Sequence, residues 1–178
     1  CIDGLVSCNR ALQGPQAQPD DGTATALGVA AAQQAHLRAD DDGTLHPAAI
    51  AHLAAGPVHG WPAPSLVCVE DTHLASGGRP WPVERLAAVA AAGVPVHLDG
   101  ARLFNAAVAT GTTPAERAAT ALTVTSCLSK GLGAPVGSLL AGPADVIAEA
   151  RVQRKRMGGG MRQVGILAAA GLVALDTM

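Results

Sequence analysis

Aromatic residues are scarce in this chain of 178 residues, which has no tyrosine and only Trp61, Trp81 and Phe104. The hydrophobic content is nevertheless 49% and depends heavily on alanine. A chain of this length and composition is typical of a single globular domain that is large enough to bury a proper core.

A long apolar run, a signal-peptide pattern and a basic stripe are also missing, so the sequence predicts neither a membrane span nor secretion. The net charge is −2, and we expect no nucleic-acid or membrane partner. The four cysteines lack the tight spacing of a disulfide framework, and Cys68 and Cys127 fall in predicted buried strands. Reduced thiols and a cytoplasmic location are therefore expected.

Segments with β-strand character alternate with segments of helical periodicity, which predicts an α/β domain with a largely parallel sheet. The domain is expected from 25 to 178, because residues 1–24 are polar, rich in chain-breaking residues and typical of a loop or disorder. The acidic residues 40–42 lack the spacing of a calcium loop, so a solvated turn and no metal site are expected. The expected strands are 26–32, 65–70, 94–100, 121–128 and 136–141, and the expected helices are 47–55, 83–92, 102–109, one from 114, one from 143 and 163–176, the last with Ile166, Leu167, Ala170 and Leu175 on its apolar side.

Charged residues stand at the ends of three predicted strands: Glu70, Asp99 and, two residues past its strand, Lys130. Ligand sites in such sheets lie beyond the carboxyl ends of the strands. A lysine among glycines between two buried strands can be desolvated and act as a nucleophile; alternatively, it extends from a turn into solvent. For Asp99, the alternative to a catalytic role is a local pair with Arg102 that caps the next helix.

A lysine, an aspartate and an arginine are together what pyridoxal phosphate requires. The lysine forms a Schiff base, the aspartate keeps the pyridine nitrogen protonated, and the arginine binds the substrate carboxylate. The sequence therefore predicts pyridoxal phosphate as the cofactor.

Three segments resemble the pyridoxal-phosphate-dependent threonine aldolases: HLDGARLFNAA at 97–107, CLSKGLGAPVGS at 127–138, and Lys155 followed by GGGMRQ at 158–163. The resemblance runs from about residue 25 to residue 178. It implies the three-layer large domain of the aspartate aminotransferase fold, a homo-oligomer (dimer or tetramer), and cleavage of L-threonine or L-allo-threonine to glycine and acetaldehyde. The alternatives are β-elimination or transamination on the same scaffold, or a truncated remnant without catalysis.

By position, the resemblance implies Lys130 as the Schiff-base lysine, Asp99 as the partner of the ring nitrogen and Arg102 as the carboxylate ligand. His59 and His73 are implied as candidate bases for the substrate hydroxyl, with water as the alternative. His59 matches a family histidine only if one residue is inserted before the strand at 65–70.

Lys155 and Arg162 resemble basic residues near the cofactor or at a subunit contact, and the alternative for both is a solvated helix end. The segment 70–73 resembles a Glu-Asn-Thr-His segment of the family, but Asp71 replaces the asparagine and Leu74 replaces a second one. These replacements put an amide contact at this place in doubt.

Two parts of the family pattern are not found in the sequence. Residues 1–24 do not resemble the family's N-terminal segment, which supplies a phosphate-binding Gly-Thr turn and a histidine stacked on the ring. The family's C-terminal small domain, with a second carboxylate-binding arginine, would begin about where this chain stops. The expectation is therefore an incomplete large domain that is a poor or inactive aldolase by itself.

Overall fold

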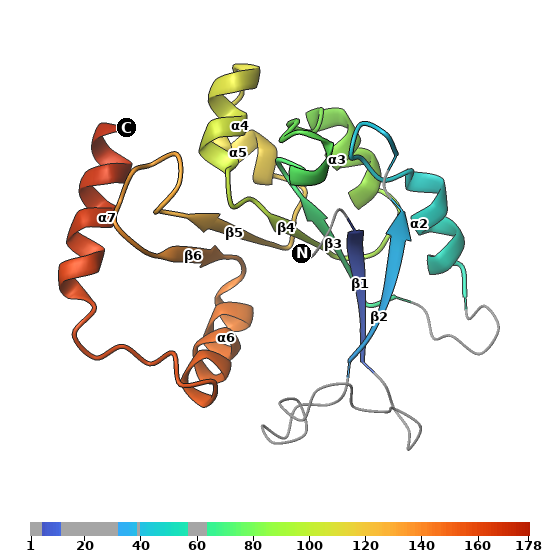
Figure 1. The fold of residues 1–178 in the computed structure, drawn as a ribbon. Helices are drawn as coiled ribbons and strands as arrows, with labels where there is room; N and C mark the ends of the chain where they lie inside the picture. The colour runs from blue at the N-terminus through green and yellow to red at the C-terminus, as the bar shows by residue number, and fades with distance from the viewer. Residues whose placement is uncertain (1–4, 12–31, 39, 57–63) are drawn as a thin grey trace.

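The computed structural model describes residues 5–11, 32–38, 40–56 and 64–178. Its strands form one six-stranded sheet in the order β2–β1–β3–β4–β5–β6 (Figure 1). β1 is antiparallel to β2 and β3, β3–β4–β5 are parallel neighbours, and β6 is antiparallel to β5. The strands are β1 (Leu5–Ala11), β2 (Ala32–Arg38), β3 (Leu66–Glu70), β4 (Val96–Asp99), β5 (Thr123–Cys127) and β6 (Ser138–Ala141).

The α/β class is as predicted, but the sheet is mixed, and the expected parallel pairing is found only in its central strands. The connection 128–137 contains no helix, and a parallel pair needs a crossover, so β6 returns antiparallel to β5. The expected loop at 1–24 is wrong for Leu5–Ala11, because pairing with two neighbouring strands supplies what local composition does not reveal. Residues 12–24 and 26–31 lie outside the described residues.

Helices are found where the periodicity predicts them, within a few residues at each end, and one short 3₁₀ turn follows β3. Proline and a capping threonine explain one of these starts: Pro114 is the first residue of α5, and Thr113 and Glu116 form a reciprocal capping box. The helices are α2 (Pro47–Ala54), η1 (Leu74–Ser76), α3 (Val83–Ala90), α4 (Leu103–Thr110), α5 (Pro114–Ala118), α6 (Ala144–Arg156) and α7 (Gly165–Thr177).

The main core lies on one face of the sheet, under α2, α3 and α4 (Figure 1). Alternate residues of the central strands point into it, namely Val67 and Val69 of β3 and Val96 and Leu98 of β4. Each such side chain contributes about 1.5–3 kcal/mol of burial free energy. The remaining strand residues therefore belong to the opposite face, and Asp99 is one of them. From the helices, the core receives Ile50, Leu86, Val89 and Leu103.

A second, smaller cluster joins α7 to the loop that follows β5. Leu128, Leu132 and Ala134 of the loop pack with Ala174 of α7, and Phe104 of α4 packs against them. The buried residues of α7, Gly171 and Ala174, are small because the helix lies close to Leu128. A methyl group at Gly171 would lie only 2.9 Å from the Leu128 side chain. Two residues of the predicted apolar side of this helix are exposed, Ile166 by 83% and Leu175 by 42%.

Candidate functional site

Asp99 and Lys130 lie beyond neighbouring parallel strands. Asp99 is the last residue of β4, opposite Thr125 of β5, and Lys130 follows the end of β5. β4 and β5 run in the same direction (Figure 1). Both residues therefore stand at the same edge of the sheet, where these strands have their carboxyl ends. The topology therefore brings together the two residues on which the predicted chemistry depends most.

Hydrogen bonds hold Asp99 from both sides. Its carboxylate oxygen Oδ1 accepts from the Ala101 amide at 3.2 Å and from the Thr125 hydroxyl at 3.5 Å. Its carbonyl accepts from the Asp71 amide at 2.9 Å, and the next amide, of Gly100, donates to the Thr125 carbonyl at 2.9 Å. The carboxylate is half-buried.

Arg102 precedes the first turn of α4 and is half-buried. Both Arg102 and Asp99 belong to the described part of the chain, and no ion pair joins them. The local pair considered as an alternative is therefore not formed here, and the guanidinium remains available to a ligand carboxylate.

His97 lies on the same face of β4 as Asp99, two residues before it. Its Nδ1 is 2.8 Å from the Thr123 hydroxyl oxygen. Burial lowers the pKa of His97, and the nearby charge of Asp99 opposes this effect in part. The imidazole is therefore held neutral beside the carboxylate.

This burial predicts a pH dependence of stability. The pKa of His97 lies below the usual 6.5, so on acidification the unfolded chain takes up a proton before the folded chain does. Neutral His97 therefore contributes its full stabilisation above about pH 6.5, and this contribution is lost as the pH falls through the pKa that His97 has in the folded chain. Between about pH 7.5 and 5, a His97→Asn variant should lose less thermal stability than the wild type does. Replacement of the exposed His52 by Asn is the control, and an equally steep acid loss in both variants would contradict this expectation.

The loop that carries Lys130 is tied by its own backbone. The Leu128 amide donates to the Gly137 carbonyl at 2.9 Å, and the Gly133 amide donates to the Lys130 carbonyl at 2.9 Å. Lys130 itself is exposed. The desolvated lysine expected from the sequence is not found, because the side chain leaves a turn at the sheet edge, outside both apolar clusters; the alternative of a lysine that extends into solvent describes it better.

Glycine is required beside this lysine. A side chain at Gly131 would overlap Asn105 of α4, which lies directly against it. A methyl group at Gly100 would lie 2.8 Å from the Thr125 carbonyl oxygen. The Asn105 side chain of α4 therefore fills the space beside Gly131 in the loop that carries Lys130, and the turn after Asp99 packs closely against the backbone of β5.

The structure describes three of the other four candidate residues. His59 lies outside the described residues. His73 is only 4% exposed; its Nδ1 is 3.0 Å from the Ser76 hydroxyl, and its Nε2 is buried without a hydrogen-bond partner. Lys155 and Arg162 are exposed, and neither side chain forms a hydrogen bond or ion pair within the described segments. Lys155 lies in the solvated last turn of α6, and Arg162 lies in the solvated turn that precedes α7.

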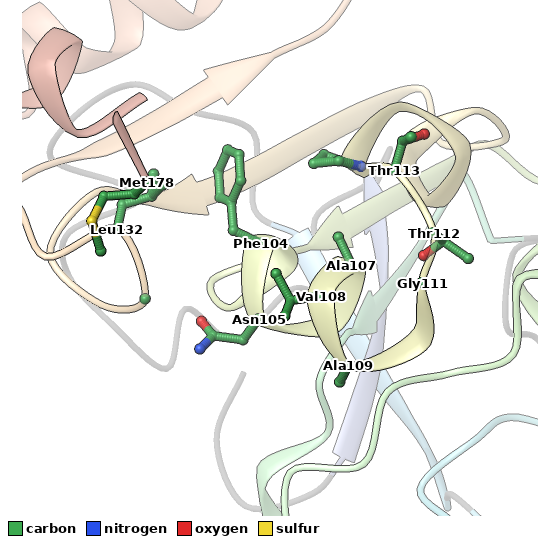
Figure 2. Close-up of a pocket in the computed structure, with 12 residues that line it drawn as sticks. Phe104, Asn105, Ala107, Val108, Ala109, Gly111, Thr112, Thr113, Leu132 and Met178 are labelled. Atoms are coloured by element: carbon green, nitrogen blue, oxygen red, sulfur yellow. The ribbon is translucent and has the colours of Figure 1, made fainter. Parts of the chain in front are cut away.

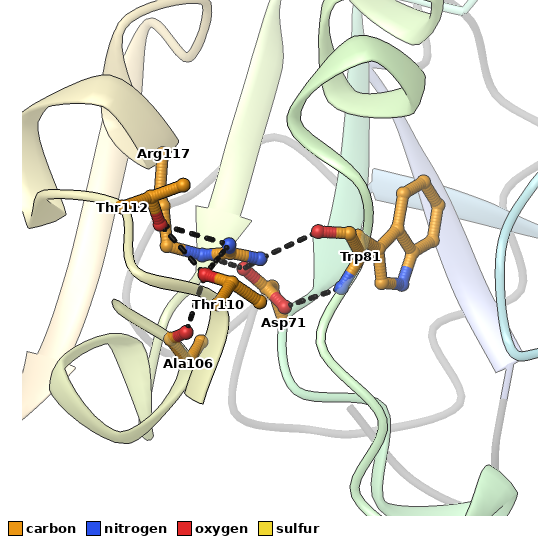
Figure 3. Close-up of polar contacts among 6 residues, drawn as sticks. All are labelled: Asp71, Trp81, Ala106, Thr110, Thr112 and Arg117. Atoms are coloured by element: carbon orange, nitrogen blue, oxygen red, sulfur yellow. Dashed lines mark hydrogen bonds and ion pairs between the residues drawn. The ribbon is translucent and has the colours of Figure 1, made fainter. Parts of the chain in front are cut away.

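Sequence reasoning missed a buried ion pair between Asp71 and Arg117 (Figure 3). No motif in the sequence points to Arg117, and Asp71 stands out there only as a replacement for an asparagine. A signal was available, since Asp71 directly follows an apolar strand and a buried carboxylate requires a partner. The sequence does not reveal which cation supplies it.

A cavity of 560 Å³ lies on the outer side of α4, next to the lysine loop (Figure 2). None of the described residues that line it has a titratable side chain, so these residues offer no general acid or base. In the part of the chain that the structure describes, no group of three or more His, Cys, Asp or Glu could hold a metal ion, and no helix is long and apolar enough to cross a membrane. The cavity is lined by Phe104, Asn105, Ala107, Val108, Ala109, Gly111, Thr112, Thr113, Pro114, Gly131, Leu132 and Met178.

A model of the beta-eliminating lyase family matches residues 19–178. The chain belongs to this family. The match confirms the relationship inferred from the three motifs and includes every predicted site residue.

Relatives of this beta-eliminating lyase chain include low-specificity L-threonine aldolase 1 of Arabidopsis thaliana, 45% identical over 146 residues, which are 79% of this chain and 41% of the relative. The low-specificity L-threonine aldolase of Escherichia coli K12 is 59% identical over 80 residues, 45% of this chain and 24% of the relative. The chain thus spans less than half the length of these relatives. A Listeria monocytogenes structure provisionally described as an L-allo-threonine aldolase matches with a TM-score of 0.57 and 26% identity over 61% of this chain and 32% of the other.

The family depends on pyridoxal phosphate, and the side chains at the sheet edge fit that cofactor by their chemistry. Lys130 supplies an amine, Asp99 a carboxylate fixed at its strand end, and Arg102 a guanidinium to which none of the described residues offers a carboxylate partner. These are the groups that would hold the cofactor covalently, face its ring nitrogen and bind an amino-acid carboxylate.

Proposed function

We propose that the protein is a threonine aldolase that cleaves L-threonine or L-allo-threonine to glycine and acetaldehyde with pyridoxal phosphate. The observation that carries the proposal is the position of Asp99 and Lys130 at the carboxyl ends of the adjacent parallel strands β4 and β5. The names of the Arabidopsis and Escherichia coli relatives support the substrate class.

Each residue has a separate task in this reaction. Lys130 would hold the cofactor covalently and release it to a substrate amine, Asp99 would face the ring nitrogen, and Arg102 would bind the substrate carboxylate. When bound, pyridoxal phosphate supplies an electron sink for the charge left on the α-carbon. His59 or His73 takes the proton of the β-hydroxyl as the Cα–Cβ bond breaks, acetaldehyde leaves, and protonation of the α-carbon gives glycine.

His73 suits the task of the base because its Nε2 has no hydrogen-bond partner among the described residues, while its Nδ1 lies beside the Ser76 hydroxyl. A hydrogen bond at Nδ1 fixes the ring orientation and leaves the other nitrogen to accept a proton. A His73→Asn variant tests whether this residue or His59 is the base, because it keeps a polar group near Ser76 but has no Nε2.

The proposal is tested by incubating the protein with L-threonine and saturating pyridoxal phosphate and measuring glycine and acetaldehyde. Equal amounts of both products are expected. Products of deamination or transamination without glycine would favour the other reactions of the scaffold. Absence of the absorbance change that accompanies covalent binding to lysine would favour a non-catalytic protein.

Two substitutions at the sheet edge should differ in the size of their effects on activity. Asp99→Asn removes the charge that faces the ring nitrogen, and we expect a loss of kcat of about 100-fold or more. Arg102→Lys keeps a positive charge and loses only the fork geometry, so we expect about a tenfold loss, mainly in KM. Steady-state glycine production measures both, and an equal or reversed order of the two losses would contradict the assignment.

A further inference from the structure

The Asp71–Arg117 pair is completely enclosed, with both side chains 0% exposed. Nε and Nη2 of Arg117 donate to Oδ2 of Asp71 at 2.9 and 2.7 Å, and Nη2 also donates to the Trp81 carbonyl at 2.7 Å. The other carboxylate oxygen of Asp71 accepts from the Trp81 amide at 2.9 Å (Figure 3). Since both partners are held by several bonds at fixed angles, the pair has little freedom to move.

The pair is connected to the strand end that carries Asp99 and to the far end of the helix that follows it. At the strand end, the Asp71 amide donates to the Asp99 carbonyl at 2.9 Å. At the far end of α4, Nη1 of Arg117 donates to the hydroxyl of Thr110, the last residue of that helix, at 3.0 Å. The Thr110 hydroxyl in turn donates to the Ala106 carbonyl at 2.7 Å. The strand before Asp99 and the helix after it are therefore anchored to the same buried ion pair.

We propose that Asp71 and Arg117 are positioning residues that set the place of the Asp99 carboxylate, and through α4 that of Arg102. Neither residue touches the cofactor or the substrate in this role. The inference rests on the proposed function, because it is there that Asp99 and Arg102 have tasks that depend on position. It also gives Asp71, which replaces an asparagine of the family segment that 70–73 resembles, a reason of its own: both of its carboxylate oxygens accept hydrogen bonds, whereas one of the two positions in an amide is a donor.

The first test uses amide hydrogen exchange in the cofactor-free protein. The Gly100 amide, which lies beside Asp99, is compared with the Val67 amide, which bonds to the Pro95 carbonyl at the opposite end of β3 and β4. In Arg117→Met the ratio of Gly100 to Val67 exchange should rise at least about tenfold, because the strand end opens locally. Ile50→Ala is the control, since it destabilises the same core without touching the pair and should leave the ratio unchanged.

An unchanged ratio in Arg117→Met would overturn the proposal. If that variant does not fold, Asp71→Asn/Arg117→Met replaces it, because this variant leaves no buried charge but still lacks the bond to Thr110. The same rise in the ratio is expected there, and no rise would again overturn the proposal.

The second test measures the absorbance spectrum of the protein loaded with pyridoxal phosphate. The absorbance spectrum of the Arg117 variant should move toward that of Asp99→Asn, since both weaken the contact of the carboxylate with the ring nitrogen. A wild-type spectrum together with lowered thermal stability would mean that the pair stabilises the fold only. If the wild-type protein does not bind the cofactor, the proposed function fails, while the exchange ratio still decides whether the pair positions Asp99.

Discussion

Lys130→Ala is expected to abolish covalent binding of pyridoxal phosphate and to lower glycine production from threonine by more than about 1,000-fold. The amine of Lys130 is the group at the sheet edge that can hold the cofactor covalently, and alanine has no group that replaces it. Because the side chain is exposed, its removal should change thermal stability very little. A loss of activity with an unchanged melting temperature would therefore report on chemistry and not on folding.

The chain offers a matched control, since it contains only two lysines, Lys130 and Lys155. Lys155→Ala removes the same side chain from the exposed end of α6 and should retain covalent cofactor binding. Borohydride reduction of the loaded protein followed by peptide mapping should label Lys130. A label on Lys155 would disprove the assignment.

The central strands and the site edge could be predicted because their signals are local. β3 and β4 are mainly apolar and each ends at an acidic residue, which in β4 is Asp99 itself, and β5 (Thr123–Cys127) is rich in β-branched residues. Once the direction of neighbouring strands is known, Asp99 and Lys130 must come to the same edge. This step needs strand order and chain direction, but no knowledge of side-chain contacts.

The side of the sheet formed by the N-terminal strands could not be predicted in the same way. β1 lies in a segment rich in polar residues and becomes a strand through its pairing with β2 and β3. For Lys130 the sequence leaves two alternatives open, a desolvated and a solvent-exposed side chain, since flanking glycines indicate close packing but do not say which side is packed. Gly131 in fact lies against Asn105, and the lysine side chain leaves in another direction, into solvent.

The ion pair is the clearest case of information that a local pattern does not contain. Asp71 and Arg117 are 46 residues apart, in a strand-to-helix connection and a short helix. The capping box of Thr113 and Glu116 explains why α5 begins where it does, but not why its arginine is buried. Only the folded arrangement shows that one guanidinium serves the Asp71 carboxylate, the Trp81 carbonyl and two threonine hydroxyls.

Arg117→Met should lower the free energy of unfolding by about 3–5 kcal/mol, because it leaves the Asp71 carboxylate buried without its cation. Asp71→Asn should also destabilise, since the guanidinium then loses its counter-charge. The double variant Asp71→Asn/Arg117→Met removes both charges and should lie closer to the wild type than Arg117→Met does, because uncharged groups of similar volume often replace a buried ion pair at little cost.

Urea unfolding of the four proteins measures the cycle, with unchanged m-values as the check that the transitions remain comparable. Arg154→Met, on the exposed part of α6, is the control and should change the free energy of unfolding by less than about 0.5 kcal/mol. If the effects of the two single substitutions simply add in the double variant, the two side chains do not depend on each other. The pair would then not be the link through which α5 holds the end of β4, and the positioning of Asp99 would have to come from the strand ladder alone.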